Sequence, residues 1–149
     1  MQVACIEFAR NVLGLKEANS TEFDERTSDP IIMLIEGKDR EKIGGTLRLG
    51  EYPTTVQPGT LCNKLYNSEL IHERHRHRYE FNNDYREQFE KAGMVFSGTY
   101  KDQNLVEVVE LKDHPFFIAA QYHPEFTSRP SKPNPLFKGL IDHIINDEK

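Results

Sequence analysis

The pattern of apolar residues in the first part of the chain predicts a helix followed by strands. Residues 1–13 carry apolar side chains at helical spacing, and Gly14 is suited to end that helix. Residues 31–35 form a continuous apolar run, which predicts a buried strand. Residues 36–45 are polar and end in two adjacent glycines, so we expect a mobile loop there, followed by extended chain over residues 46–56.

The rest of the sequence alternates short helices with apolar strands. The run over residues 116–122 is strongly apolar, and we expect it to be a central strand. The expected elements are helices over residues 60–66, 84–91 and 136–146 and strands over residues 70–81, 94–100, 105–111 and 116–122. The pattern predicts one mixed α/β domain over residues 1–149. It is rich in strands for its size, as it would be if strand–helix units were missing at its N-terminal end.

Composition and charge narrow the class of protein. The net charge is −5 with both signs scattered along the chain, which argues against a nucleic-acid-binding protein. No apolar run approaches the roughly 20 residues that a bilayer span requires, so we expect no membrane segment. The two cysteines, Cys5 and Cys62, have neither disulfide-framework nor zinc spacing, which favours a reducing, cytoplasmic compartment.

A histidine and a carboxylate stand two residues apart where the last apolar run ends. His123 could take a proton from a nucleophile if Glu125 held its tautomer and stabilised the imidazolium. The alternative is a histidine at a strand end that makes an ordinary structural hydrogen bond. The spacing alone does not distinguish the two.

A run of arginines and histidines at residues 74–78 also has two interpretations. In extended chain, Arg74, Arg76 and Arg78 share one face while His75 and His77 share the other, so a functional arginine face is predicted. The alternative is a small metal- or RNA-binding protein built around residues 72–78. No thiols or carboxylate cluster complete a metal site, so we expect no metal.

The sequence resembles class I glutamine amidotransferase domains at both ends. His-Pro-Glu at residues 123–125 follows an apolar strand, and Met1-Gln2 opens a helix as it does after the nucleophile elbow of that class. Three internal segments, at residues 19–23, 44–50 and 73–82, resemble the CTP synthase family in particular. Together these segments cover essentially the whole chain.

This resemblance implies a fold and a reaction. The fold would be a mixed sheet with flanking helices. The domain would hydrolyse L-glutamine to glutamate and ammonia without a cofactor of its own. The ammonia would pass to an N-terminal synthetase domain of the same parent chain, which aminates UTP with ATP and magnesium. The family also implies GTP as allosteric activator and a homo-oligomer, a tetramer.

The resemblance also implies roles for individual residues. Gln2 and Glu22 would contact the amino-acid end of glutamine, with Glu22 pairing with the α-ammonium. Arg78 would bind the α-carboxylate, because a guanidinium forms a bidentate, charge-assisted pair with that group. His123 would act as general base and acid, with Glu125 holding it.

Regulation is expected in the segment that contains Gly44, Gly45 and Arg48. In similar enzymes this segment belongs to a lid that responds to GTP, and an arginine suits contact with phosphate or a guanine edge. The alternative is an ordinary surface arginine beside a turn.

The nucleophile is expected to lie outside these residues. Cys5 falls on an apolar helix face and not at a glycine-flanked elbow, so we expect a buried thiol. We assign no role to Cys62. The chain is therefore expected to be a fragment that starts just after the elbow and is inactive alone. A non-catalytic binding or regulatory domain, or the glutaminase subunit of another class I amidotransferase, are the alternatives.

Overall fold

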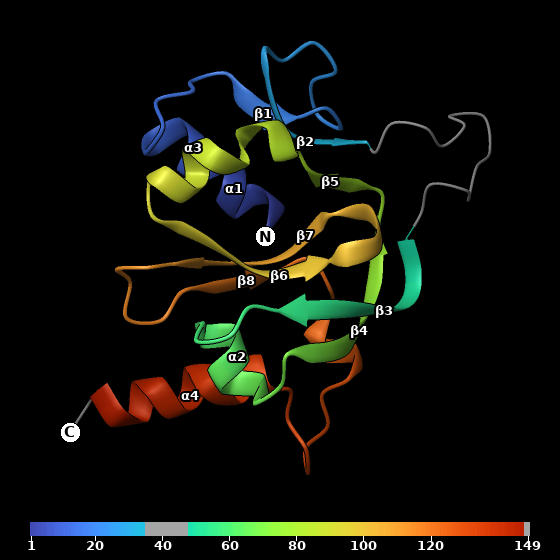
Figure 1. The fold of residues 1–149 in the computed structure, drawn as a ribbon, viewed down its shortest axis with the longest axis vertical. Coiled ribbons are helices and arrows are strands. Elements are labelled where there is room, and N and C mark those ends of the chain that lie inside the picture. Colours follow the sequence, from blue (N-terminus) through green and yellow to red (C-terminus); the bar gives the residue numbers. More distant parts are fainter. Residues whose placement is uncertain (35–47, 148–149) are drawn as a thin grey trace.

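The computed structural model describes residues 1–34 and 48–147 of the chain (Figure 1). The helices are α1 (Gln2–Asn11), α2 (Leu61–Tyr66), α3 (Arg86–Lys91) and α4 (Pro135–Asp147). The strands are β1 (Ala18–Ser20), β2 (Asp29–Leu34), β3 (Arg48–Val56), β4 (Leu70–His77), β5 (Tyr79–Phe81), β6 (Met94–Tyr100), β7 (Leu105–Leu111) and β8 (Ile118–Ala120). Single 3-10 turns span Asn83–Tyr85, Lys101–Gln103 and Pro124–Phe126.

The described strands form two sheets. The smaller has the order β1-β2-β5, with β1 parallel and β5 antiparallel to β2. The larger has the order β4-β3-β6-β7-β8 and is antiparallel throughout. Helices α1 and α3 lie beside one another near the small sheet, while α2 and α4 lie together at the other end (Figure 1). The expected mixed α/β architecture is therefore confirmed.

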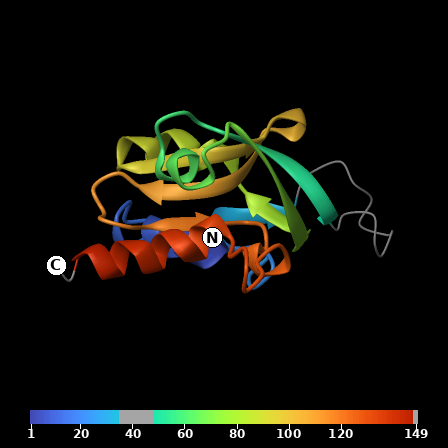
Figure 2. The same cartoon turned by 90° about the horizontal axis from the view of Figure 1, so that it is seen from below.

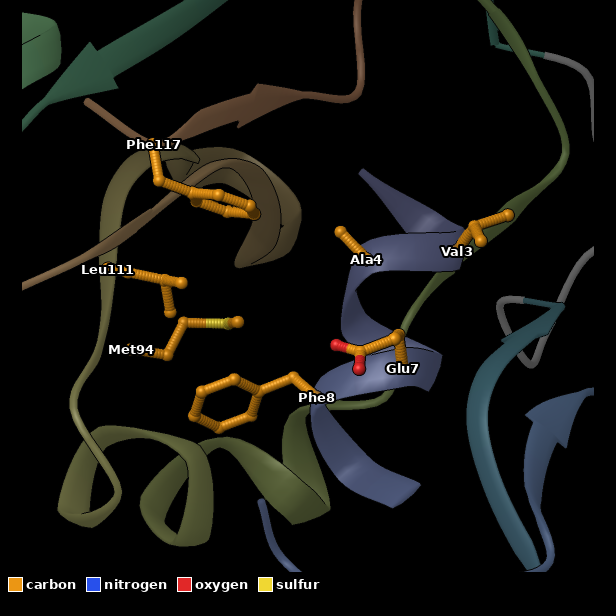
Figure 3. A pocket seen from close by; sticks show the side chains of 7 residues that line it. All are labelled: Val3, Ala4, Glu7, Phe8, Met94, Leu111 and Phe117. Atoms are coloured by element: carbon orange, nitrogen blue, oxygen red, sulfur yellow. The ribbon is translucent and has the colours of Figure 1, made fainter. Parts of the chain in front are cut away.

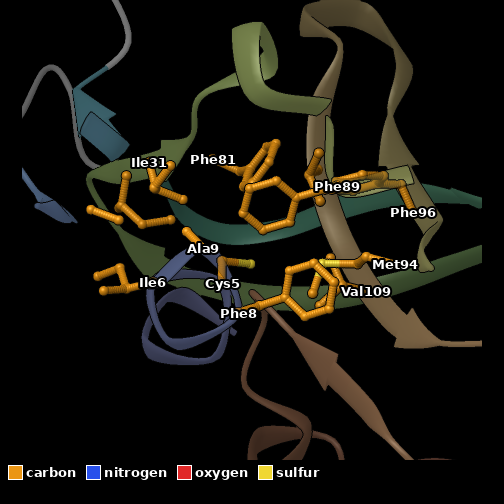
Figure 4. Packing of buried hydrophobic residues seen from close by; sticks show 13 residues of the cluster. Cys5, Ile6, Phe8, Ala9, Ile31, Phe81, Phe89, Met94, Phe96 and Val109 are labelled. Atoms are coloured by element: carbon orange, nitrogen blue, oxygen red, sulfur yellow. The ribbon is translucent and has the colours of Figure 1, made fainter. Parts of the chain in front are cut away.

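Buried aromatic side chains join α1 and α3 to both sheets. Phe89 of α3 is fully buried and lies 5.3 Å from Phe8 of α1 and 5.1 Å from Phe81 of β5, measured between ring centroids. Phe96 of β6 completes the group, 5.0 Å from Phe81 (Figure 4). This core holds α1 against β5.

Helix α2 shows how the sequence specifies a short helix. Thr60 caps it by accepting a hydrogen bond from the Asn63 N–H at 3.2 Å. The Glu110 carboxylate accepts from the first two N–H groups, those of Leu61 at 2.9 Å and Cys62 at 2.7 Å. A carboxylate at a helix N-terminus satisfies otherwise unpaired donors and complements the helix dipole. The helix predicted over residues 60–66 is thus confirmed.

Two predicted strands differ from the structure. The strand expected over residues 70–81 is interrupted at Arg78, because the chain there passes from β4 in the large sheet to β5 in the small one. The run over residues 116–122, expected to be a central strand, contributes only Ile118–Ala120, at the end of the five-strand order and half-buried. Its apolar character therefore does not make it central among the described strands.

Helix α4 lies on the outside of the molecule, as the view from below shows (Figure 2). Leu136 packs into a second core with Val56, Ile71 and Tyr122. Of the helices within residues 1–34 and 48–147, none combines the length and apolar character that a membrane span needs.

Candidate active site

His123 and Glu125 are in direct contact at the end of the last strand. The His123 Nδ1 and Glu125 Oε1 atoms are 2.8 Å apart. The hydrogen bond from His123 holds the pKa of the Glu125 carboxyl below its usual range. A neutral imidazole that donates from Nδ1 presents its lone pair on Nε2, so this arrangement directs His123 to accept a proton there. The geometry fits a base with its orienting carboxylate.

The backbone and ring of His123 are also held. Its N–H donates to the carbonyl oxygen of Arg74 at 2.8 Å, which ties the segment to β4. Its ring stacks on Phe126 with 5.1 Å between centroids. The side chain remains 38% exposed, so a substrate or a nucleophile can reach it.

A buried carboxylate holds the segment that follows Glu125. Glu73 of β4 accepts hydrogen bonds from the Thr127 hydroxyl, the Asn134 amide and the Tyr66 hydroxyl, each at 2.8 Å. Glu73 is only 3% exposed. Three donors on one buried carboxylate make a tightly specified junction. The His-Pro-Glu segment is therefore anchored to β4 at both His123 and Thr127.

Two of the predicted glutamine-binding residues, Gln2 and Arg78, lie near the junction of α1 and β5. Gln2 opens α1, and its side-chain amide donates to the Tyr79 carbonyl at 2.9 Å and to Gln121 Oε1 at 3.3 Å. Arg78 immediately precedes Tyr79 and is exposed between β4 and β5. Glu22 is exposed in the turn after β1, where its N–H donates to the Ser20 hydroxyl at 3.2 Å. The structure connects Gln2 to the backbone beside Arg78, and the roles of these residues stay predictions.

The alternative interpretation of Arg48, as an ordinary surface arginine beside a turn, is wrong. Its residue is 3% exposed, and Nη1 pairs with Glu80 at 3.1 Å and with Glu107 at 2.5 Å. The guanidinium lies over the rings of Tyr52 and Tyr100, at 4.5 and 4.9 Å from their centroids. The Glu80 carboxylate, the hydrogen-bonded Glu107 carboxyl group and two aromatic faces compensate the burial of the charge. Gly44 and Gly45, the other expected lid residues, lie outside the described residues.

Two histidines, the buried His75 and the half-buried His77, extend this charged cluster. His77 Nε2 lies 2.7 Å from Glu80 Oε1, and His75 Nδ1 lies 3.3 Å from Glu107 Oε2. Burial and the nearby Arg48 lower the pKa of His75 to about 3. His75 and His77 share the inward side of β4, whereas Arg74, Arg76 and Arg78 are exposed, as predicted.

The pKa values of the two carboxyl groups in the cluster are shifted in opposite directions. Burial raises the pKa of Glu107 to about 8, although Arg48 opposes the shift. Burial also disfavours the Glu80 carboxylate, but the hydrogen bond to His77, together with Arg48 and Gln121, leaves its pKa below the ordinary value. At neutral pH, Arg48 and Glu80 thus form the charged pair. This cluster was not predicted from the sequence, since Glu107 lies in an apolar run and no motif marks either glutamate.

Sequence reasoning also missed Gln121, which contacts both Gln2 and β5. Its side-chain amide donates to the Tyr79 carbonyl at 2.9 Å and to Glu80 Oε2 at 3.1 Å. A polar residue at the end of an apolar strand, two positions before a candidate base, was the available signal.

Neither cysteine is placed to act as a nucleophile. Cys5 and Cys62 are both fully buried, and burial raises the pKa of each thiol to about 12. A thiolate, not a thiol, is the attacking species. The expectation of a buried thiol at Cys5 is confirmed.

A separate apolar pocket lies beside α1 (Figure 3). It has a volume of about 360 Å³, and Phe117, Leu111 and Met94 line the side opposite the helix. None of the predicted site residues lines it, so it is separate from the His123 site. Among the described residues, no three His, Cys, Asp or Glu side chains are grouped to hold a metal ion.

Comparison with known proteins agrees with this geometry. Residues 1–143 match the model of the family described as "Glutamine amidotransferase class-I". The chain belongs to the class I glutamine amidotransferase family. This amidotransferase chain is 57% identical to the CTP synthase of Mesoplasma florum over 149 residues, which are 99% of the chain and 28% of that protein. It is 61% identical to the CTP synthase of Bacillus subtilis over 142 residues, 95% of the chain and 26% of that protein.

A solved structure supports the amidotransferase fold. The chain superposes on the glutaminase domain of CTPS from Trypanosoma brucei with bound acivicin, with a TM-score of 0.90 and 36% identity. The match covers 98% of this chain and 57% of that one. The predicted class I amidotransferase fold is thereby confirmed, and so is the similarity to CTP synthases. The amidotransferase chain spans roughly a quarter of the length of these curated relatives.

Proposed function

We propose that this chain is the C-terminal portion of the glutamine-hydrolysing domain of a CTP synthase. The observation that carries the proposal is the 2.8 Å contact between His123 Nδ1 and Glu125 Oε1, in a segment anchored to the strand that leads to Arg78. The similarity to CTP synthases over nearly the whole chain supports the choice of family.

The chemistry follows from that contact. His123 Nε2 takes the proton from a cysteine thiol, and the thiolate attacks the side-chain amide carbon of glutamine. The imidazolium, stabilised by Glu125, then returns the proton to the departing nitrogen, so ammonia leaves and a thioester remains. Water, activated by the same imidazole, releases glutamate and restores the thiol. Each proton that His123 accepts is thus passed on within the cycle.

The remaining site residues orient the substrate. Arg78 would hold the α-carboxylate of glutamine, and Glu22 its α-ammonium, with Gln2 beside them. One fixed charge of each sign orients a zwitterion so that its amide faces the reacting groups. In this proposal the substrate is L-glutamine.

The nucleophile belongs to a part of the parent protein outside these residues, because Cys5 and Cys62 are buried thiols. Residues 1–149 alone would then not hydrolyse glutamine. The ammonia would serve an N-terminal synthetase domain that aminates UTP, with ATP and magnesium bound there. A cytoplasmic homotetramer is the proposed assembly.

GTP activation is assigned to the segment around Gly44 and Gly45. Arg48 would take part through its contacts with Glu80 and Glu107, because its guanidinium is buried over the rings of Tyr52 and Tyr100. In this proposal Arg48 contributes from the protein interior and does not contact the nucleotide.

The test uses the full-length parent protein and residues 1–149 side by side. Glutamate release from glutamine and CTP formation from UTP are measured with glutamine or with ammonium chloride as nitrogen source. We expect the parent to perform all three reactions and the isolated chain none. Glutamate release by the isolated chain would contradict the proposed position of the nucleophile, and a parent without glutaminase activity would refute the function.

A further inference from the structure

The side chain of Gln121 connects three separate parts of the site. It is 7% exposed, and it accepts a hydrogen bond from Gln2 Nε2 at 3.3 Å while donating to the Tyr79 carbonyl at 2.9 Å and to Glu80 Oε2 at 3.1 Å. Its backbone N–H donates to the Glu107 carbonyl at 2.8 Å. Both amide hydrogens and the amide oxygen are therefore engaged.

Two of these contacts end at or next to a residue with a predicted role. Gln2 is itself a predicted glutamine contact, and Tyr79 directly follows Arg78. Along its own chain, Gln121 lies two residues before His123. A single buried amide thus connects the residues proposed to hold the amino acid with the residue proposed to move the proton.

We propose that Gln121 is a positioning residue for glutamine hydrolysis, which sets the distance and orientation between the substrate-binding end and His123. The inference rests on the proposed function. Gln121 acts through Gln2 and the Tyr79 carbonyl and takes no proton itself. A misplacement of about 1 Å can reduce a rate by roughly a hundredfold, so a connection of this kind has a measurable effect on catalysis.

The donor and acceptor pattern requires an amide at position 121. The Tyr79 carbonyl can only accept, and Glu80 is held in its charged form by His77 and Arg48, so both require a donor. A carboxylate at position 121 would face the two acceptors without a hydrogen. Protonation of that carboxyl would restore one donor and remove the repulsion. Gln121→Glu is therefore expected to respond to pH, whereas Gln121→Met, which lacks both donor and acceptor, is not.

The experiment is carried out in the full-length parent protein with both variants. Glutamate release gives kcat and KM for glutamine between pH 6 and pH 9 (roughly the range in which a histidine base and a buried carboxyl titrate), and each value is divided by that of the unmodified protein at the same pH. Division removes the pH dependence of catalysis that all forms share. CTP formation from ammonia and thermal unfolding are measured in parallel.

We expect both variants to lose about tenfold to a hundredfold in kcat/KM for glutamine, with a raised KM, while ammonia-dependent CTP formation is kept. The relative activity of Gln121→Glu is expected to rise as the pH falls, and that of Gln121→Met to stay level. Asn63→Asp is the matched control, because the side chain of Asn63 in α2 is also a hydrogen-bonded amide. It accepts from the Gly59 N–H and donates to the Ser68 carbonyl, both at 3.1 Å. The control variant is expected to hydrolyse glutamine normally.

Two results would overturn the inference. One is a pH-independent ratio near one for Gln121→Glu; the other is equal loss of glutamine- and ammonia-dependent synthesis, which would mark a purely structural role. If the Glu and Met variants do not fold, Gln121→Asn keeps the amide but shortens its reach, and unchanged kcat and KM in that variant would also refute the inference. Failure of the unmodified protein to release glutamate would instead refute the proposed function.

Discussion

Gln2 and Gln121 lie 119 positions apart in the sequence, yet their side chains share a hydrogen bond of 3.3 Å and both donate to the carbonyl oxygen of Tyr79. This arrangement joins the first turn of α1 to β5 and to the segment that ends in His123. The site therefore depends on contacts between distant segments.

Removal of the Glu125 charge should affect catalysis more than folding. In the full-length parent, Glu125→Gln keeps a group that can hydrogen-bond His123 but cannot stabilise the imidazolium. We expect kcat for glutamate release to fall by about 10²–10⁴-fold, the usual contribution of general acid–base catalysis. Glu87→Gln, an exposed change on α3, is the control and should be neutral. Unimpaired glutamate release by Glu125→Gln would show that the carboxylate does not assist His123.

Replacement of Glu73 should destabilise the domain. Glu73→Ala leaves the Thr127 and Tyr66 hydroxyls and the Asn134 amide without their shared acceptor. We expect the free energy of unfolding to fall by about 3 kcal/mol, because buried donors without partners are costly. Urea denaturation measures it, with the exposed Glu69→Ala as control. Equal midpoints for the two variants would contradict this prediction.

Two glycine substitutions should differ in their effects. A Cβ at Gly98 would lie 2.7 Å from Val108 Cγ2 and 3.0 Å from Thr54 Cγ2, between two buried strands. Gly98→Ala is expected to cost about 1–3 kcal/mol of stability, the usual range for overpacking. A Cβ at Gly139 would meet chiefly the end of the Leu65 side chain, which can move, and alanine favours the α4 helix. Thermal unfolding should therefore show a much smaller loss of stability for Gly139→Ala than for Gly98→Ala, or a gain in stability.

Stability should decline as the pH rises above neutrality because of Glu107. Its folded pKa of about 8 exceeds the ordinary value of 4.5, so the folded state binds a proton that the unfolded state has lost between these values. The resulting stability is complete below pH 4.5 and disappears as the pH passes through 8. His75, with its pKa lowered from 6.5 to about 3, has the opposite slope between those two values. A net decline from this pair is therefore expected between pH 6.5 and pH 8.

Glu107→Gln tests this assignment. The variant cannot lose a proton, so its stability relative to the unmodified protein should improve from pH 6.5 to pH 8.5, with a difference of about 1.4 kcal/mol per unit of pH over the range where only the unfolded carboxyl is ionised. Urea denaturation at several pH values measures the change. Parallel pH profiles for the two proteins would show that Glu107 is not the group responsible.

The sequence predicted much of the local structure because those signals are local. The helical spacing of residues 1–13 and the short helix over residues 60–66 depend on neighbours within a few positions, and both were predicted. The interruption at Arg78 was missed, because alternation continues across it while the chain changes sheets. The short β8 was also overestimated, since an apolar run does not reveal how many of its residues find strand partners.

The sequence by itself determined the family, through segments whose order along the chain is specific. It also indicated His123 and Glu125, which are only two positions apart. Only the tertiary structure decided that Arg48 is buried against Glu80 and Glu107, and that Gln121 meets Gln2. The physical reason is that a charge or amide enters the interior only where distant strands supply its partners. The hydrophobic pattern and the residue types do not show which distant residues come into contact. The register of β3, β5 and β7 determines those contacts.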